Sequence, residues 1–218
     1  MATAVRSKAK QEKESQILET ADLFAELETP YAMRFSLVGV KTYFFNRFDV
    51  STFEANESSA PGSKRRKEID PEVLVWRDCD GNLACEGVQV KNALVVAGRY
   101  MPDPSKSGRK SAIPFIKEAL NVQEEHCSFG VKKWDDIDVR GARYRNGAHG
   151  PKRRPVLYAG WHIDATIEVL VPELLRPGDV AMLMTKGGLV RGLGDNHTYG
   201  FGRFTVVEIG DPFELKWR

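Results

Sequence analysis

The sequence predicts an α+β fold, and two patterns in its last third carry that prediction. Apolar and polar residues alternate between residues 156 and 171, which is typical of a strand with one buried face. The apolar members of this alternation are Ile163, Ala165, Ile167 and Val169. A helical segment over 177–188 follows, and the apolar run within 203–210 predicts a last strand. We therefore expect the order strand, helix, glycine-rich loop, strand.

Prolines and glycines set the ends of the expected helices. Pro177 and Asp179 suit the first turn of one helix, and Gly187-Gly188 suit its end. Pro114 fits a first helical turn in the same way. Helices are expected over 177–188, 111–122, 88–100 and, with amphipathic spacing, 8–28.

The other segments predict strands and exposed loops. A strand is expected over 33–45, and residues 73–76 and 83–85 are expected to form a hairpin around Asp80-Gly81. Polar stretches rich in glycine, proline and charge predict three long loops, at 54–70, 102–110 and 139–155. The chain then divides into an N-terminal helical extension, 1–30, and one α+β domain, 31–218.

Length and composition bound the class of protein. The 218 residues, with 42% hydrophobic and 28% charged side chains, suit a globular protein with a good core. No apolar run approaches the roughly 20 residues of a membrane span, and the N-terminus has no apolar signal-peptide core. Three cysteines without a CxxC pair favour free thiols in a reducing compartment. We therefore expect a cytoplasmic protein without membrane partner, metal or cofactor.

The net charge of +2 conceals local basic clusters, which hint at a polyanionic partner. The segment 139–155 interleaves cations with a tyrosine on a glycine-rich chain, a composition typical of contacts to single-stranded nucleic acid. Its candidate contact residues are Arg140, Arg143, Tyr144, Arg145, His149, Lys152, Arg153 and Arg154. Weaker candidates are Lys64, Arg65, Arg66, Lys67, Arg109 and Lys110.

Residues 192–204 read GLGDNHTYGFGRF, so five residues separate two Gly-hydrophobic-Gly triplets. A dinucleotide-binding loop is excluded, because such a loop leaves a strand and opens a helix, whereas this one leaves a helix and enters a strand. One remaining interpretation is a flexible connection in which the glycines only make turns. The other is a surface on which glycines let a polyanion approach the backbone.

The two triplets and the following Arg203 resemble the C-terminal glycine-rich loop of the RAMP superfamily, the RNA-binding proteins of CRISPR effector complexes and their relatives. The resemblance covers residues 160–209. It implies a ferredoxin-like (RRM-like) βαββαβ core, with this loop between the last helix and the last strand. The chain departs from the family in one respect, because the insert DNHTY contains neither Lys nor Arg. Arg191 and Arg203 would have to supply the charge.

The resemblance assigns RNA contacts to the loop. The candidate residues are Arg191, Gly192, Gly194, His197, Tyr199, Gly200, Gly202 and Arg203. Arginines bind phosphates or stack on bases, and an exposed tyrosine stacks on unpaired bases. Phe201 is instead expected to pack in the core.

We therefore expect a non-catalytic protein that binds single-stranded RNA mainly through backbone and shape, with single-stranded DNA left open. It resembles a backbone-type subunit or a free-standing phage or mobile-element relative, and assembly along RNA or homo-oligomerisation through 8–28 is expected. One alternative is a metal-independent endoribonuclease of the kind that cleaves CRISPR repeats, for which the candidate catalytic residues are His162, His197 and His149. Another is an interaction module or inhibitor that acts on a nucleic-acid-guided complex.

Overall fold

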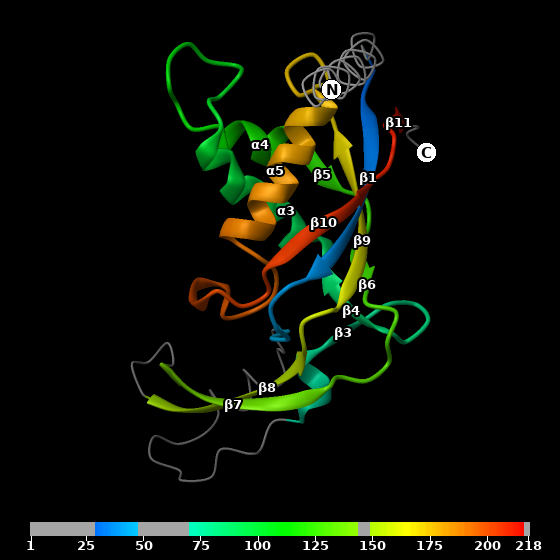
Figure 1. Cartoon of the computed structure of the whole chain (residues 1–218), viewed down its shortest axis with the longest axis vertical. Coiled ribbons are helices and arrows are strands. Elements are labelled where there is room, and N and C mark those ends of the chain that lie inside the picture. The colour runs from blue at the N-terminus through cyan, green and yellow to red at the C-terminus, as the bar shows by residue number, and fades with distance from the viewer. Residues whose placement is uncertain (1–28, 48–69, 144–148, 216–218) are drawn as a thin grey trace, which may run out of the picture.

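The computed structural model describes residues 29–47, 70–143 and 149–215 (Figure 1). The expected helix over 8–28 and all but the last residue of the expected loop 54–70 lie outside these ranges. The described residues form three α-helices and antiparallel sheets, so the mixed α and β composition is confirmed. Of the helices in the described ranges, none has both the length and the apolar character needed to cross a membrane.

The largest sheet has the strand order β10-β1-β9-β5, and each neighbouring pair is antiparallel. Its strands are β1 (Tyr31–Gly39), β5 (Leu120–Val122), β9 (His162–Val169) and β10 (Phe204–Ile209), with β11 (Phe213–Glu214) paired to the start of β1. Strands β1 and β9 pair over eight residues, and they form the centre of the sheet. The strand expected within 203–210 is thus confirmed. The strand expected over 156–171 is confirmed for β9, whereas residues 156 and 157 belong to β8 (His149–Leu157) of another sheet.

Three helices cover one face of this sheet (Figure 1). They are α3 (Gly87–Ala97), α4 (Ile113–Ala119) and α5 (Pro177–Val190), and the short 3-10 segments are η1 (Pro71–Leu74), η2 (Gly98–Tyr100) and η3 (His197–Tyr199). The four alternating apolar residues of β9 are fully buried against these helices, as their spacing predicts. Each side chain of this size that leaves water contributes roughly 1.5–3 kcal/mol, so this layer holds the core.

A second, small sheet has the strand order β3-β4-β6. Its strands are β3 (Trp76–Arg77), β4 (Leu83–Glu86) and β6 (His126–Ser128). The expected hairpin is present, and Gly81 turns it with a φ of 78°. Its first strand begins later than expected, because residues 71–74 form a 3-10 turn whose N-cap is Asp70.

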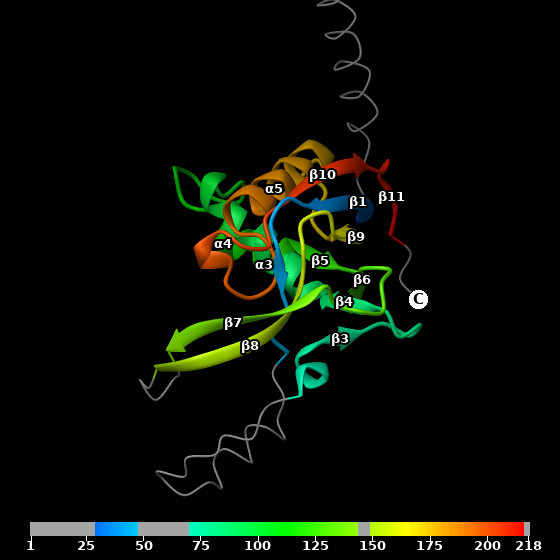
Figure 2. The same cartoon turned by 60° about the horizontal axis from the view of Figure 1, so that its bottom comes forward.

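The expectation of a long loop over 139–155 is wrong. Strands β7 (Asp136–Arg143) and β8 (His149–Leu157) pair along their whole length and form a two-stranded ribbon that projects from the body (Figures 1 and 2). Strand β2 (Tyr43–Phe44) pairs with the base of β8. Asp138 stands opposite Arg154 across the ribbon, whereas Arg140 stands opposite another cation, Lys152.

Two more predicted boundaries are corrected. The expected strand 33–45 is two strands in different sheets, because β1 ends at Gly39 and β2 begins at Tyr43. A side chain at Gly39 would overlap the ring of Trp161, so only glycine fits at the end of β1. The expected helix 111–122 ends at Ala119, since residues 120–122 pair with β9 as strand β5.

Helix α5 starts at Pro177 as predicted but continues through the two glycines that were expected to end it. A Cβ at Gly187 would lie 3.0 Å from the backbone of Ala93, and one at Gly188 would lie 2.7 Å from Cδ2 of Phe204. These glycines therefore serve close packing of α5 on α3 and β10.

Candidate nucleic-acid interface

Residues 191–203, called the glycine loop below, connect α5 to β10. Five of these residues have positive φ, which strains any residue with a Cβ and suits glycine. They are Gly192 (69°), Gly194 (76°), Asn196 (57°), Gly200 (85°) and Gly202 (65°). The glycines of the predicted motif are thus required by backbone conformation.

Three of the glycines are also required by close contact. A Cβ at Gly192 would lie 2.6 Å from the carbonyl oxygen of Gly202, and one at Gly194 would lie 2.7 Å from the carbonyl oxygen of Phe44. A Cβ at Gly202 would overlap the carbonyl oxygen of Leu193. Gly200 differs from them, because a Cβ at this position would have no other atom within 4 Å among the described residues.

The backbone N–H groups of the loop glycines donate to acceptors inside the protein. Gly192 donates to Gly187 O at 2.9 Å and Gly202 donates to Thr42 O at 2.8 Å. Gly200 donates to His197 O at 3.0 Å, and Gly194 donates to the side-chain oxygen of Gln89 at 2.9 Å. These amides are therefore occupied, and contacts from the loop to a ligand depend on its side chains.

The ribbon and the glycine loop meet at Asp195. Its carboxylate accepts a hydrogen bond from Nε of Arg154 at 2.8 Å and lies 3.5 Å from Nζ of Lys152. Burial opposes ionisation of Asp195, but the Asn196 N–H and the two cations outweigh it and lower the pKa of this carboxyl. Burial and the neighbouring Arg154 lower the pKa of Lys152. Two predicted contact regions, far apart in sequence, are thus brought together.

Arg140 makes the second contact between ribbon and loop. Its guanidinium carbon lies 4.5 Å from the ring centroid of Phe201 and 5.1 Å from that of Phe44, while its Nε donates to Asp138 at 2.7 Å. The rings of Phe44 and Phe201 are 4.7 Å apart. Phe201 is therefore half-buried against Phe44 and is not part of the core as expected, and one of its neighbours is a cation.

Arg191 and Arg203 are the first and last residues of the glycine loop, and the charge of Arg203 affects the pKa of Arg191. Burial, with a smaller effect of Arg203, lowers the pKa of Arg191. Nη1 of Arg191 donates to Nε2 of His197, whose Nδ1 lies 3.2 Å from the carbonyl oxygen of Gly194. Nη1 of Arg203 is buried and has no hydrogen-bond acceptor among the described residues. A buried donor without an acceptor is costly, and an anion is a natural partner for it.

Tyr199 is the most exposed large side chain of the loop, at 81% of its surface. It lies in η3, between two left-handed residues, Asn196 and Gly200. Its ring is therefore open to solvent on a turn of defined shape, which suits stacking on an unpaired base.

The other predicted contact residues lie in different places. Arg143 and His149 are register partners at the outer end of the ribbon, and Arg153 is exposed on β8 between Lys152 and Arg154. The loop 102–110, with Arg109 and Lys110, lies at the opposite end of the helical layer from the glycine loop (Figure 1). The remaining predicted residues, Tyr144, Arg145, Lys64, Arg65, Arg66 and Lys67, are outside the described ranges.

His162 lies on the sheet face that points away from the helices, as predicted. Its Nε2 is 3.6 Å from Oδ1 of Asp164, and its side chain is half exposed. Asp164 also pairs with Arg34 at 2.6 Å and accepts a hydrogen bond from Ser36 at 2.6 Å. These two partners, with the Coulombic effect of His162, outweigh burial and lower the pKa of Asp164. His162 thus lies beside a carboxylate, whereas the partners of His197 are Arg191 and Gly194.

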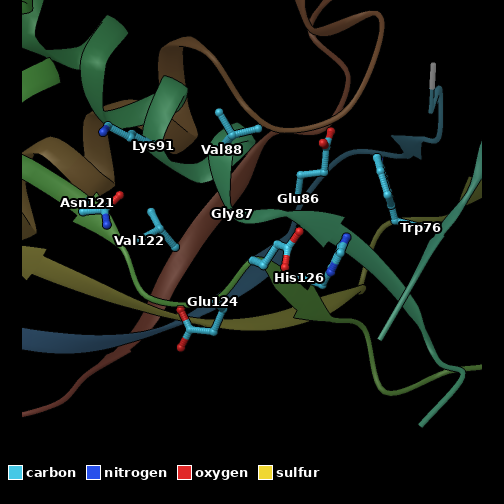
Figure 3. A pocket seen from close by; sticks show the side chains of 10 residues that line it. Trp76, Glu86, Gly87, Val88, Lys91, Asn121, Val122, Glu124 and His126 are labelled. Carbon is cyan, nitrogen blue, oxygen red and sulfur yellow. The ribbon is translucent and has the colours of Figure 1, made fainter. Parts of the chain in front are cut away.

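A hollow of about 320 Å³ lies between the start of α3 and strands β3, β5 and β6 (Figure 3). Its acidic residues are Glu86, Glu124 and Glu125, against a single cation, Lys91. This charge disfavours phosphate, so the hollow is a poor continuation of the loop surface. Within the described ranges, no group of three or more His, Cys, Asp or Glu side chains is placed to hold a metal ion.

Sequence reasoning missed three residues that shape the interface. Gln89 of α3 accepts hydrogen bonds from Gly194 N and, at 2.9 Å, from the hydroxyl of Tyr43. Asp195 forms ion pairs with two cations of the ribbon, Lys152 and Arg154. Lys41 is exposed beside the loop, and its N–H donates to Arg203 O at 3.2 Å. A lone glutamine in a helix gives no sequence signal, whereas Asp195 stands inside the motif itself.

No family model matches this sequence, and no curated protein matches it significantly. Among solved structures, the chain is similar to one in the cryo-EM structure of Type III-B Cmr-beta bound to cognate target RNA, with 12% identity, a TM-score of 0.48, and coverage of 93% of this chain and 67% of that chain. It is also similar to Cmr6 from Pyrococcus furiosus, with 10% identity, a TM-score of 0.46, and coverage of 83% and 100%. Similarities of this size assign neither a family nor a function.

Proposed function

We propose that this protein binds single-stranded RNA, without cleaving it, through one cationic surface. The surface is formed by the glycine loop and the base of the ribbon. Its described members are Arg140, Lys152, Arg191 and Arg203, whereas Arg154 is buried in its ion pair with Asp195. The observation that carries the proposal is the buried Nη1 of Arg203, which has no acceptor among the described residues. A turn of the half-buried Arg203 side chain toward a phosphate oxygen would satisfy this donor and reduce the repulsion between Arg203 and Arg191.

Charge and shape support RNA over a small anion. Asp138 and Asp195 pair with members of the cationic surface, and the surface retains excess positive charge. Tyr199 adds an exposed ring beside it, so one ligand that carries phosphates and unpaired bases accounts for both features. The glycine amides are occupied, so we assign contacts to side chains and leave to the glycines the shape of the loop.

We also propose that the core is ferredoxin-like and of RAMP type. Strands and longer helices of the main sheet follow the order β1, α3, β5, β9, α5, β10, which is a βαββαβ sequence. The other elements are inserted between these, with β6–β8 placed between β5 and β9, except β11, which follows β10. The glycine loop joins the last helix to the last strand, as the sequence resemblance implies.

Salt-dependent binding to a single-stranded RNA oligonucleotide tests the function. Each phosphate contact on a single strand contributes about −0.7 to the slope of log K against log salt, so Arg191→Ala with Arg203→Ala should make the slope shallower by about 1.4. The matched control is Arg99→Ala with Lys117→Ala, which removes the same charge from exposed positions on the helical layer. An equal change of slope in both double variants would overturn the proposal. So would the absence of RNA binding by the wild type at about 50 mM salt.

The same experiment separates the alternatives. Tighter binding to single-stranded DNA of matched sequence would identify DNA, in place of RNA, as the ligand. Absence of any nucleic-acid binding would favour an interaction module that binds an acidic protein. Assembly along RNA, with 8–28 as a contact, stays a prediction. Complex masses on RNA of increasing length test it, since assembly adds protein copies in proportion to length.

A metal-independent endoribonuclease is the second candidate, and the position of His162 beside Asp164 favours it. A carboxylate near one ring nitrogen can orient a histidine for general acid–base chemistry. Incubation of labelled RNA with the protein in a chelator tests this function. Products that disappear in His162→Ala would establish cleavage, whereas intact RNA throughout would leave binding alone.

A further inference from the structure

Cys85 and Cys127 lie directly opposite each other on the antiparallel strands β4 and β6. Both are buried, at 0% and 1% exposure. Hydrogen bonds two residues away on either side define the type of pair: Phe129 N donates to Leu83 O at 2.9 Å, and Gly87 N donates to Glu125 O at 2.8 Å. Because hydrogen-bonded and non-hydrogen-bonded pairs alternate, the two cysteines occupy a hydrogen-bonded position.

This position brings two thiols within reach of a covalent bond. Directly opposite residues project to the same face, and Cα atoms of a hydrogen-bonded pair are about 5.5 Å apart, inside the roughly 4.4–6.8 Å range of disulfides. The Cβ atoms of such a pair, about 5.5 Å apart, need to approach by roughly 1–2 Å to reach the range of about 3.5–4.5 Å found in disulfides. A hydrogen bond with Cys127, and then burial, raise the pKa of the Cys85 thiol well above its usual range. The two thiols are therefore close, and Cys85 is largely protonated, which makes its oxidation slow in the closed protein.

We propose that Cys85 and Cys127 are an oxidative modification site, at which a hydroperoxide converts the two thiols into an intrachain disulfide. One thiolate attacks the peroxide, the O–O bond breaks, and a sulfenic acid and water form. The second thiol attacks the sulfenic sulfur, the S–S bond forms, and a second water leaves. Two thiols thus lose two protons and two electrons, and one hydrogen peroxide becomes two water molecules. A hydroperoxide suits this site, because it is small enough to enter when the short β4–β6 pairing opens.

The cross-link ties together the segment that supports the candidate interface. It closes a chain loop that contains α3, α4 and β5. The next pair in the register, Glu86 and His126, lines the hollow in Figure 3, so the disulfide fixes two walls of that hollow. Helix α3 begins directly after β4, and its Gln89 holds Gly194 of the glycine loop. The modification therefore restrains the support of the loop and leaves the cationic side chains unchanged.

The full chain with Cys79→Ser tests the site, because Cys79 is the exposed cysteine and competes for peroxide. Peroxide should lower the intact mass by about 2 Da, the mass of two hydrogens, and peptide mapping should link residues 85 and 127. The Tm should rise by about 10 °C and return on addition of dithiothreitol. If Cys79→Ser folds poorly, the wild-type protein with Cys79 alkylated beforehand serves the same purpose.

The control is the Cys79→Ser variant with Cys127→Ser added, which retains one buried thiol and should show neither the mass change nor the Tm rise. Two outcomes would overturn the proposal. In the first, both thiols of the peroxide-treated Cys79→Ser protein still react fully with a thiol label after unfolding, although the same treatment oxidises Cys79 of the wild type. In the other, Cys85 and Cys127 gain oxygen without forming a link.

Discussion

The guanidinium carbon of Arg140 lies 4.5 Å from the ring centroid of Phe201. This contact joins the ribbon to the glycine loop, and Asp138 holds the guanidinium from the ribbon side. Arg140→Lys should keep the charge but lose the planar stack, and lower the free energy of unfolding by about 0.5–1 kcal/mol in urea titrations. Arg99→Lys, on the helical layer, is the control and should change it little. Equal stability of the two variants would contradict this interpretation.

Gly202→Ala should destabilise the protein much more than Gly200→Ala. Both glycines have positive φ, but only the Cβ at position 202 would overlap another atom, the carbonyl oxygen of Leu193. We expect a loss of about 1 kcal/mol for Gly200→Ala and about 3 kcal/mol or more for Gly202→Ala, measured by chemical unfolding. Equal losses would mean that backbone conformation alone explains the motif.

Two glycines of α5 should respond in opposite directions to alanine. Gly188→Ala pushes a methyl group against Phe204 and should cost about 1–3 kcal/mol. Gly178 has open space around its Cβ direction, so Gly178→Ala should stabilise the helix by about 0.4–1 kcal/mol. Thermal unfolding of both variants measures the difference, and a stabilising Gly188→Ala would contradict the packing assigned to this helix.

Tyr199→Ala should weaken RNA binding without loss of stability, since its ring is 81% exposed. Loss of one stacked base corresponds to about 1–3 kcal/mol, or roughly five- to 150-fold in Kd. Tyr100→Ala is the control, because Tyr100 is 58% exposed and follows the C-terminal end of α3, whereas Gln89, which contacts the glycine loop, is near the start of this helix. Fluorescence anisotropy with a single-stranded RNA measures both variants. Unchanged affinity in Tyr199→Ala would remove stacking from the proposed mode of binding.

Acid should weaken the junction between ribbon and loop. The pKa of Asp195 is lower in the folded protein than its usual value of 3.8, so its contribution is complete above that value and is lost as the pH falls through the folded pKa. Asp195→Asn should therefore be less stable than the wild type at pH about 7, and the difference should shrink below pH about 4. A difference that is constant with pH, measured by urea unfolding, would contradict the ion pairs with Arg154 and Lys152.

The sequence predicts most of the buried elements correctly, because their signals are local. The alternation in β9 and Pro177 of α5 reflect burial and helix geometry that act within a few residues. The ribbon escapes prediction for the opposite reason. Arg140 and Lys152 stand opposite each other through backbone pairing, although both are cations, and such pairing leaves no apolar period in the sequence. Residues 120–122 continue a helical pattern in the sequence, and only pairing with β9 makes them a strand.

The site is predicted in part. The glycine motif locates the loop, and Arg191 and Arg203 stand at its two ends. That they supply the charge missing from the insert stays a prediction. The motif does not reveal that Asp195 binds two cations of the ribbon, because charge pairs across 40 or more positions, as between Arg154 and Asp195, depend on the folded chain. The role of Gln89 also depends on the fold, since its partner Gly194 is 105 residues away.

The contacts of Gly192, Gly194 and Gly202 bear on how relatives of this protein are sought. Folding alone would preserve these glycines, because a methyl group at any of them meets a backbone carbonyl oxygen. A shared glycine pattern therefore identifies a common loop architecture, even in a protein that has lost its ligand. Arg203 and Tyr199 have no comparable structural duty: one has a buried donor without an acceptor in the described chain, and the other an exposed ring. Retention of these two side chains is the better criterion for a shared ligand.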